Sequence, residues 1–268
     1  NHIKPILFST IGLAKKALIF DCDNTIWKGI LGEDGFENIQ MSTNTKHGYI
    51  YSEIQSMALS LEIQGVLLGL CSKNNFEDVM EVVNSHPDMQ LKEEHLSIIK
   101  VNWKDKVSNL KSISSELNIG LDSIVFIDDS QFEINLVNEK LPMVTTIQVP
   151  SDIYNYPNLL RQNRTLFFTL YSTDEDKNRS LMYQQQEERK DEIHNFDNIE
   201  DYLSSLNIIM SLIKIDGKNI QRLSQLSQKT NQFNLTTRRY TENDLIRFNQ
   251  NSNYEVIAFS VEDKFGES

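Results

Sequence analysis

The chain is built around one stretch near its N-terminus, Ala17-Leu-Ile-Phe-Asp21-Cys22-Asp23-Asn24-Thr25-Ile-Trp27. Four apolar residues run directly into two carboxylates, Asp21 and Asp23, and a hydroxyl, Thr25. An apolar run without alternation is typical of a strand buried on both faces of a parallel sheet. The carboxylates then lie at the carboxyl end of the strand, where open α/β sheets bind ligands. Two close acids favour a cation between them, and oxygen ligands favour Mg²⁺. A strand ending in a solvated acidic turn is the alternative.

Three further apolar segments also end in polar residues. They are 65–71, followed by Ser72-Lys73-Asn74, then 97–101, followed by a helix that Lys106 opens, and 123–127, followed by Asp128-Asp129 and, one turn later, Glu133. Apolar residues at helical spacing predict amphipathic helices over 50–61, 76–83 and 107–117, and 143–149 reads as a last strand. Strands that alternate with helices predict a doubly wound α/β domain with a parallel sheet over 17–160, after an N-terminal segment over 1–16.

Each of these junctions also has an ordinary interpretation. Ser72 and the backbone N–H groups near a helix start suit a phosphate oxygen, but the same residues can simply form a turn and cap the helix. A lysine at a helix N-terminus is unfavourable against the dipole, so Lys106 is either a surface lysine or one aimed at a bound phosphate. The three glycines within 28–35 predict tight turns, and we expect a short hairpin or flap there.

Residues 161–268 have a different character and predict a second, partial α/β region. Charged and Gln-rich residues over 173–191 suit a helix, 208–215 reads as a strand and 220–226 as a helix. Thr241 with Asp244 resembles a capping box that opens a further helix, and 254–261 reads as a last strand. Between them, 228–240 is dense in amide and hydroxyl side chains.

The composition limits the classes of function. The chain has 268 residues and a net charge of −12, which argues against nucleic acid or an anionic membrane as its main partner. With only two cysteines, Cys22 and Cys71, a disulfide framework is not expected and a cytoplasmic location is the default. The sequence opens without Met, and we expect it to be a piece of a longer polypeptide.

Taken together, the four junctions resemble the motifs of the haloacid dehalogenase (HAD) superfamily. Asp21, Asp23 and Thr25 match its D-x-D-x-T motif, while Ser72, Lys106 and Asp128-Asp129 match its Ser/Thr, Lys and paired-acid motifs. The resemblance implies that Asp21 forms an aspartyl-phosphate and that Asp23 is the general acid and base. It also implies that Mg²⁺ is held by Asp21, Asp128 and the main-chain carbonyl of Asp23, supported by Asp129 and Glu133. The phosphate would be bound by Ser72, Lys73, Asn74, Lys106 and Thr25.

A narrower resemblance is to the FkbH-like branch of this superfamily. It is carried by the first motif extended to Gly35, by Cys71-Ser-Lys-Asn-Asn75, and by Gln228-Lys-Thr-Asn-Gln-Phe-Asn-Leu-Thr-Thr237. Such proteins join a capless HAD domain to a region like GNAT acetyltransferases, and some take 1,3-bisphosphoglycerate and load a glyceryl unit onto an acyl carrier protein. The resemblance makes Lys229, Asn231, Gln232, Asn234 and Thr236 candidates for binding the acyl group or carrier; a hydrogen-bonded structural loop is the alternative.

Cys22 has two interpretations in this setting. A thiolate is the natural acceptor of a glyceryl group, which makes Cys22 a candidate for carrying a thioester. On a strand, however, Cys22 points away from Asp21 and Asp23, and nearby carboxylates raise the pKa of a thiol. A small buried hydrophobic residue is therefore the alternative.

The leading hypothesis is a Mg²⁺-dependent HAD phosphatase linked to glyceryl or acyl transfer to a carrier protein. A plain phosphatase of a small phosphorylated metabolite or sugar is the first alternative, and it requires neither a carrier protein nor Cys22. A non-catalytic module that binds a partner through the same fold is the second. The segments between Thr25, Ser72 and Lys106 are too short for a cap domain, so an open site is expected.

Overall fold

The computed structural model describes residues 14–168, 196, 199–217, 219–229, 238–264 and 266–267. The chain divides into two compact units, residues 1–184 and residues 185–268. Within the described part of the chain, every helix is too short or too polar to cross a membrane.

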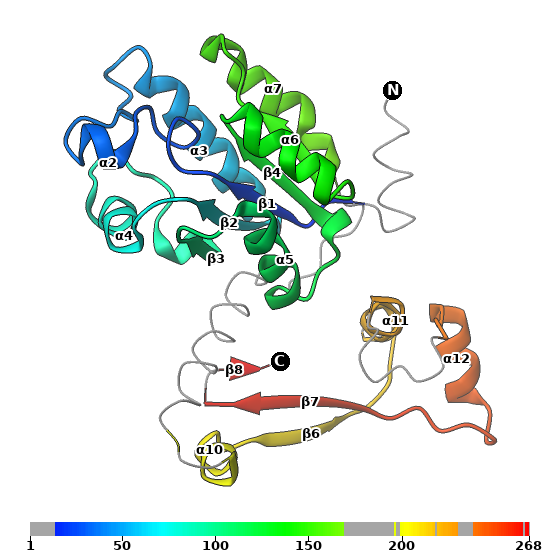
Figure 1. The fold of residues 1–268 in the computed structure, drawn as a ribbon. Helices are drawn as coiled ribbons and strands as arrows, with labels where there is room; N and C mark the ends of the chain where they lie inside the picture. The colour runs from blue at the N-terminus through cyan, green and yellow to red at the C-terminus, as the bar shows by residue number, and fades with distance from the viewer. Residues whose placement is uncertain are drawn as a thin grey trace. The chain divides into compact units, whose positions relative to one another are not determined.

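The first unit contains a five-stranded sheet in the order β3-β2-β1-β4-β5 (Figure 1). Its strands are β1 (Ala17–Phe20), β2 (Leu67–Ser72), β3 (Leu96–Val101), β4 (Ile124–Asp128) and β5 (Thr145–Gln148). All four strand pairs are parallel, and Phe20 at the end of β1 is aligned with Leu70 and Ile127. The predicted parallel sheet is thereby confirmed, and the polar residues that follow β1, β2 and β4 lie at one edge.

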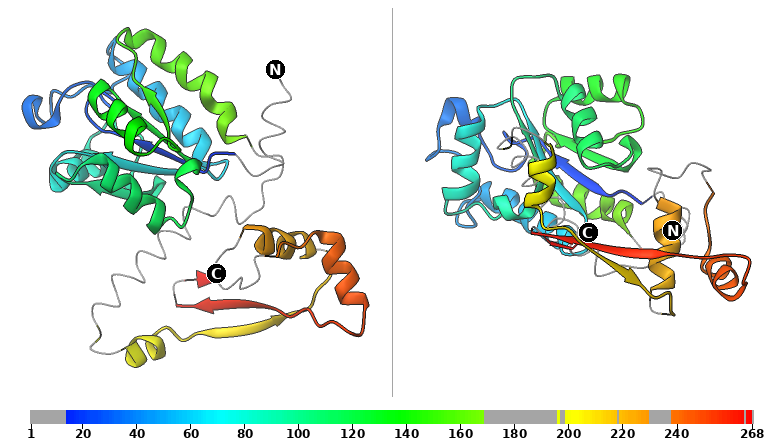
Figure 2. Two further views of the ribbon diagram at one scale, coloured as in Figure 1. Left: turned by 45° about the vertical axis from the view of Figure 1, so that its right-hand side comes forward. Right: turned by 90° about the horizontal axis from the view of Figure 1, so that it is seen from below.

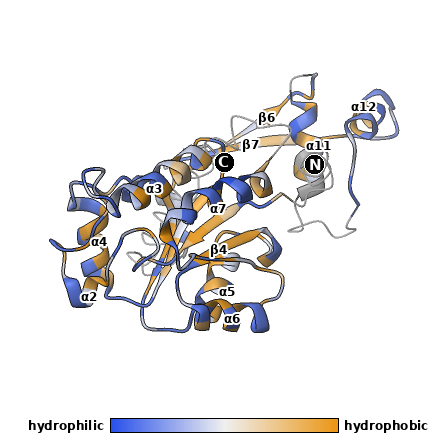
Figure 3. Ribbon diagram, turned by 90° about the horizontal axis from the view of Figure 1, so that it is seen from above, coloured by the Kyte–Doolittle hydropathy of each residue, from blue (hydrophilic) through white to orange (hydrophobic). Residues whose placement is uncertain are grey.

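Helices cover both faces of this sheet, as a doubly wound fold requires (Figures 2 and 3). The core on one face joins Leu18 and Phe20 to α3 (Gly48–Glu62), α4 (Phe76–Ser85) and α7 (Tyr156–Asn163). The core on the other face joins Ala17 and Ile19 to α5 (Lys106–Glu116) and α6 (Gln131–Lys140). Successive residues of a strand point to opposite faces, so the uninterrupted apolar run of β1 supplies both cores.

Side-chain caps fix where the helices beside the site begin. Asp105 accepts a hydrogen bond from the N–H of Ser108 and starts α5, and Ser130 accepts one from the N–H of Glu133 and starts α6. Among its described residues the unit also contains four short 3₁₀ turns, namely η1 (Glu93–His95), η2 (Leu121–Ser123), η3 (Ile153–Asn155) and η4 (Arg164–Phe167).

The segment after the first motif differs from the hairpin that its glycines predict. It contains a one-turn helix, α2 (Leu31–Asp34), and it is closed where Lys28 and Gln40 exchange two backbone hydrogen bonds of 2.9 Å. Between Thr25 and Lys106, where every residue is described, the chain forms only α2, α3, β2, α4, η1 and β3. No cap domain is inserted in this range.

The second unit contains a small antiparallel sheet in the order β6-β7-β8. Its elements are α10 (Ile199–Ser205), β6 (Ile209–Ile213), α11 (Ile220–Lys229), α12 (Glu242–Gln250), β7 (Ala258–Asp263) and β8 (Gly266–Glu267). Thr241 and Asp244 form the predicted capping box at the start of α12. The strand predicted over 254–261 begins only at Ala258, and the helix predicted over 173–191 lies outside the described residues.

Candidate active site

The backbone turns sharply directly after β1. Asn24 has a φ of 51°, in the left-handed region that Asn tolerates better than most residues. Its side-chain oxygen accepts a hydrogen bond of 3.0 Å from the N–H of Gly29, and the N–H groups of Thr25 and Ile26 both bond to the carbonyl of Cys22. These bonds fix the backbone that carries the first motif.

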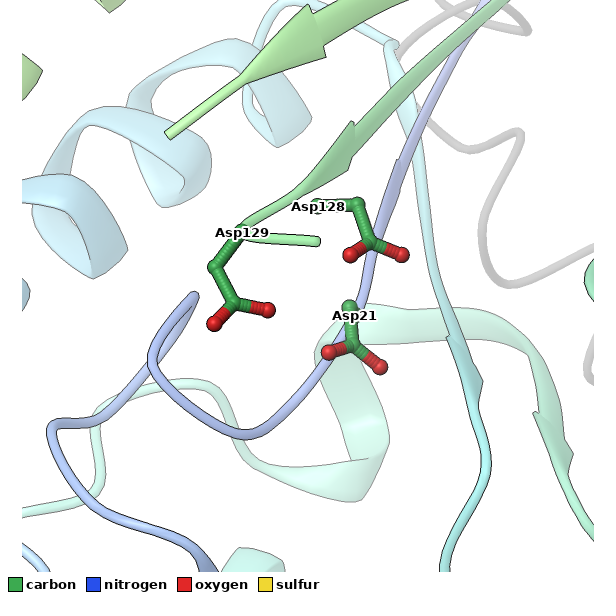
Figure 4. A group of neighbouring side chains, drawn as sticks. All are labelled: Asp21, Asp128 and Asp129. Atoms are coloured by element: carbon green, nitrogen blue, oxygen red, sulfur yellow. The ribbon is translucent and has the colours of Figure 1, made fainter. Parts of the chain in front are cut away.

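Three carboxylates meet at the carboxyl edge of the sheet (Figure 4). One oxygen from each of Asp21, Asp128 and Asp129 lies within 4.8 Å of the others, which is close enough for all three to hold one ion. Asp21 follows β1 and Asp128 ends β4; both are buried, while Asp129 is more exposed. The first motif and the paired acids therefore meet in space, although more than a hundred residues separate them in the chain.

Lys106 balances part of this negative charge. Its Nζ lies 2.8 Å from Asp21 Oδ1 and 2.5 Å from Asp128 Oδ2, and the residue is 3% exposed. Burial lowers the pKa of Lys106, but the two carboxylates outweigh burial and the net shift is upward. Burial, with Asp21 adding repulsion, raises the pKa of Asp128 to about 6 in spite of the lysine. One lysine is thus too little charge for this cluster, and a divalent cation fits it.

Asp23 points elsewhere than the three clustered acids. Its carboxylate accepts hydrogen bonds from Trp27 Nε1 at 3.0 Å, from the N–H of Leu31 at 2.9 Å and from Asn74 Nδ2 at 3.0 Å. Burial raises the pKa of Asp23, while the bonds from Leu31 and Trp27 act against that rise. A carboxyl group held in this way is suited to exchanging a proton.

Ser72 lies at the end of β2, beside the first motif. It is 2% exposed, and its hydroxyl forms a hydrogen bond with the thiol of Cys22. Cys22 is fully buried in the core, and burial, followed by repulsion from Asp21, raises the pKa of its thiol well above the usual value. This environment disfavours a reactive thiolate at Cys22. Burial likewise raises the pKa of Cys71.

Two of the remaining candidates for phosphate binding, Lys73 and Asn74, have other partners. Lys73 forms an ion pair with Glu133, with 2.6 Å between Nζ and Oε1, and Asn74 donates to Asp23. Thr25 is fully buried, and its hydroxyl oxygen makes no hydrogen bond to the described residues; the same holds for Oε2 of Glu133.

Of the candidates in the second unit, Asn231, Gln232, Asn234 and Thr236 lie outside the described residues. Lys229 is the last residue of α11.

Three aromatic residues support the site without having been assigned to it from the sequence. Trp27 binds Asp23, Tyr51 donates a 3.4 Å hydrogen bond to the carbonyl of Asn24, and Tyr156 of α7 donates one of 3.2 Å to the carbonyl of Thr25. Burial and the nearby Asp129 raise the pKa of Tyr51 to about 12, so its hydroxyl remains a donor at neutral pH. Of the three, only Trp27 could have been identified from the sequence, because a buried indole N–H four residues after Asp23 needs a hydrogen-bond acceptor.

Comparison with known proteins gives one informative relative. The chain is similar to the N-terminal part of a Bacteroides fragilis protein, which contains a phosphatase domain and was crystallised with Mg. The identity is 39% and the TM-score 0.60, over 62% of this chain and 44% of that chain. This chain thus spans less than half the length of that relative. No protein-family model and no curated protein matches it.

Two other solved structures are much less similar. A HAD-superfamily hydrolase from Geobacter sulfurreducens has 16% identity and a TM-score of 0.36, over 50% of this chain and 86% of its own. An uncharacterised protein from Corynebacterium glutamicum has 12% identity and a TM-score of 0.37, over 57% of this chain and 94% of its own. At these values neither supports a conclusion about this chain.

The sheet order, the acid cluster with its buried lysine and the 39% identity therefore agree with one another. Over 62% of its length, this chain is similar to a phosphatase domain that binds Mg.

Proposed function

We propose that this chain is a Mg²⁺-dependent phosphatase that works through an aspartyl-phosphate on Asp21. The observation that supports this most directly is the meeting of Asp21, Asp128 and Asp129 within 4.8 Å beside the buried Lys106. The Mg complex of the Bacteroides fragilis relative points to the same ion.

The residues present fit Mg²⁺. The three carboxylates offer hard oxygen ligands, and no sulfur or imidazole belongs to this cluster among the described residues. Asp21 and Asp128 would hold the ion through their carboxylates and Asp23 through its main-chain carbonyl, with Asp129 completing or supporting the set. When bound, Mg²⁺ neutralises charge that develops on the phosphoryl oxygens.

In this proposal Asp21 is the nucleophile and Asp23 is the general acid and base. Asp21 attacks phosphorus, the bond from phosphorus to the leaving oxygen breaks, and Asp23 gives its proton to that oxygen. Water then attacks the phosphorus of the aspartyl-phosphate, Asp23 takes a proton from the water, and the bond between Asp21 and phosphorus breaks. Ser72 and Lys106 would contact the phosphoryl oxygens. When substrate binds, Lys106 would therefore give up its contact with one of the two carboxylates and contact the phosphoryl group instead.

The substrate remains a narrower proposal. The resemblance to FkbH-like proteins suggests 1,3-bisphosphoglycerate and glyceryl loading of an acyl carrier protein, and the lack of a cap insertion is compatible with a substrate carried on a protein. In that branch the second unit would be part of a GNAT-like region, with Lys229 and the residues after it near the acyl group. The burial of Cys22 makes the plain phosphatase a strong alternative.

Phosphate release from 1,3-bisphosphoglycerate and from a panel of phosphorylated metabolites tests the proposal. Wild type, Asp21→Asn and Cys22→Ser are compared with Mg²⁺ and with EDTA, and mass spectrometry follows any acyl adduct. We expect release that requires Mg²⁺ and Asp21. An adduct that is lost in Cys22→Ser would support glyceryl transfer, whereas turnover indifferent to Cys22 would leave a plain phosphatase. If wild type binds Mg²⁺ but hydrolyses nothing, the proposal fails and a binding module becomes the better reading.

A further inference from the structure

The carboxylate of Asp23 is held by three donors, two from the segment that follows β1 and one from the loop that follows β2. Trp27 Nε1 and the N–H of Leu31 donate to Oδ1, at 3.0 and 2.9 Å, and Asn74 Nδ2 donates to Oδ2 at 3.0 Å. Trp27 is fully buried, and Leu31 begins the one-turn helix α2. This arrangement restrains both oxygens of Asp23.

The amide of Asn74 is fixed in the orientation that makes it a donor to Asp23. The residue is 6% exposed, and its Oδ1 accepts a hydrogen bond of 3.1 Å from the N–H of Asn75. A flipped amide would lose that bond and turn its oxygen toward the carboxylate of Asp23. The side-chain N–H of Asn74 is therefore committed to Asp23, although the sequence pattern suggests that Asn74 binds phosphate.

A count of lone pairs shows what the three donors leave open. A carboxylate offers about four positions for hydrogen bonds, two on each oxygen. Both positions of Oδ1 are taken by Trp27 and Leu31, and one position of Oδ2 is taken by Asn74. Among the described contacts, one position on Oδ2 remains free. A proton that Asp23 exchanges with substrate or water can occupy that position without breaking any of the three bonds.

We propose that Asn74 is a positioning residue for proton transfer by Asp23. It selects the lone pair of Oδ2 from which the proton is delivered, while Trp27 and the N–H of Leu31 immobilise Oδ1. This inference rests on the proposed function, because it concerns the general acid of the same site. It differs from phosphate binding in one measurable way: loss of Asn74 affects the departure of the leaving group and leaves the affinity for phosphate unchanged.

The test compares substrates that differ in their need for an acid. An alkyl phosphate, for example glycerol phosphate, has a poor leaving group and requires protonation, whereas p-nitrophenyl phosphate has a good one and hardly does. General acid catalysis supplies about 10²–10⁴-fold, so we expect Asn74→Ala to lower kcat/KM about 10- to 100-fold for the alkyl phosphate. For p-nitrophenyl phosphate we expect a change below about 2-fold, since kcat/KM covers only the steps up to aspartyl-phosphate formation.

Asn75→Ala is the matched control. Asn75 is on the same loop, is exposed, and its side chain contacts Asp78 and Trp103 instead of Asp23. Asn74→Leu, which keeps the approximate size of the side chain and removes the donor without adding a charge beside Asp23, repeats the test should Asn74→Ala fold poorly, and Trp27→Phe tests the hold on Oδ1. Equal losses for both substrates, or weaker inhibition by inorganic phosphate, would overturn the inference. Absence of any turnover by wild type would instead count against the proposed function.

Discussion

Replacement of Lys106 by methionine tests how much the buried lysine stabilises the acid cluster. Lys106 Nζ contacts Asp21 and Asp128 at 2.8 and 2.5 Å in a buried setting, so Lys106→Met leaves two buried acids without their cation. Breaking a buried ion pair from one side costs about 3–5 kcal/mol. We expect the lower end, about 3 kcal/mol, because Asp128, with its pKa already raised to about 6, can take up a proton instead.

This loss converts into a measurable shift of Tm. At 2–4 °C for each kcal/mol in a domain of this size, about 3 kcal/mol lowers Tm by roughly 6–12 °C in EDTA. The chain's two tryptophans, Trp27 and Trp103, both lie in the N-terminal unit, so their fluorescence follows that unit alone. Mg²⁺ at about a hundred times its Kd adds about 2.7 kcal/mol, and it should raise the Tm of the variant more than that of wild type, where Lys106 already neutralises two of the same carboxylates.

Lys104→Met is the control, because Lys104 is exposed just before α5 and the change also removes one positive charge. Equal melting of the Lys104 and Lys106 variants in EDTA would show that the buried lysine does not stabilise the acid cluster. A Lys106 variant that melts low and gains nothing from Mg²⁺ would show that the acids do not form an ion site.

Three further perturbations follow from the structure. The pKa of Asp128 is raised from 3.8 to about 6, so the folded state binds a proton at this group more tightly than the unfolded state does. Ionisation of Asp128 therefore lowers the free energy of unfolding as the pH rises from about 4 to about 6. In EDTA, Asp128→Asn should therefore melt above wild type at pH 8, with a gap that narrows at pH 5, and it should no longer respond to Mg²⁺. A Cβ on Gly69 would lie 2.6 Å from a side-chain carbon of Ile98, so Gly69→Ala should cost about 1–3 kcal/mol in urea unfolding, while Gly32→Ala, with nothing within 4 Å, should cost nothing. Burial lowers the pKa of His86, whose Nδ1 accepts a hydrogen bond from the N–H of Asp88. The contribution of neutral His86 to stability is therefore complete above about pH 6.5 and is lost on acidification. His86→Asn should make Tm less sensitive to pH between 7.5 and 5.5.

The parallel sheet and the polar residues at its strand ends were predictable, because each of these strands is marked by its own apolar run. The apolar runs before Asp21, Ser72 and Asp128 exclude most alternatives to a buried parallel strand, and such strands align their carboxyl ends. The entry of Asp21 and Asp128 into one cluster follows from that alignment together with the pairing of β1 with β4, and the sequence alone does not reveal which strands are neighbours. The helix that Lys106 begins was likewise visible from its apolar spacing.

The partners of individual side chains were not predictable in the same way. Asn74 and Asp23 lie on different loops, and a single sequence does not show how far apart two loops are. An asparagine that binds phosphate and one that binds Asp23 therefore look the same in the sequence. The glycines within 28–35 suggest turns but do not distinguish a hairpin from the one-turn helix α2, because that choice depends on the N–H of Leu31 finding Asp23.

The bond from Tyr156 to the carbonyl of Thr25 joins residues 131 positions apart, and this separation has a consequence for synthesis. The ribosome releases the first motif early, but Asp128 and then Tyr156 follow only after on the order of 10 s, at 5–20 residues per second. A partly translated chain thus carries Asp21 without the acids and the aromatic residues that complete its surroundings. Under the proposed function, metal binding and hydrolysis should begin only after α7, which carries Tyr156, has been made.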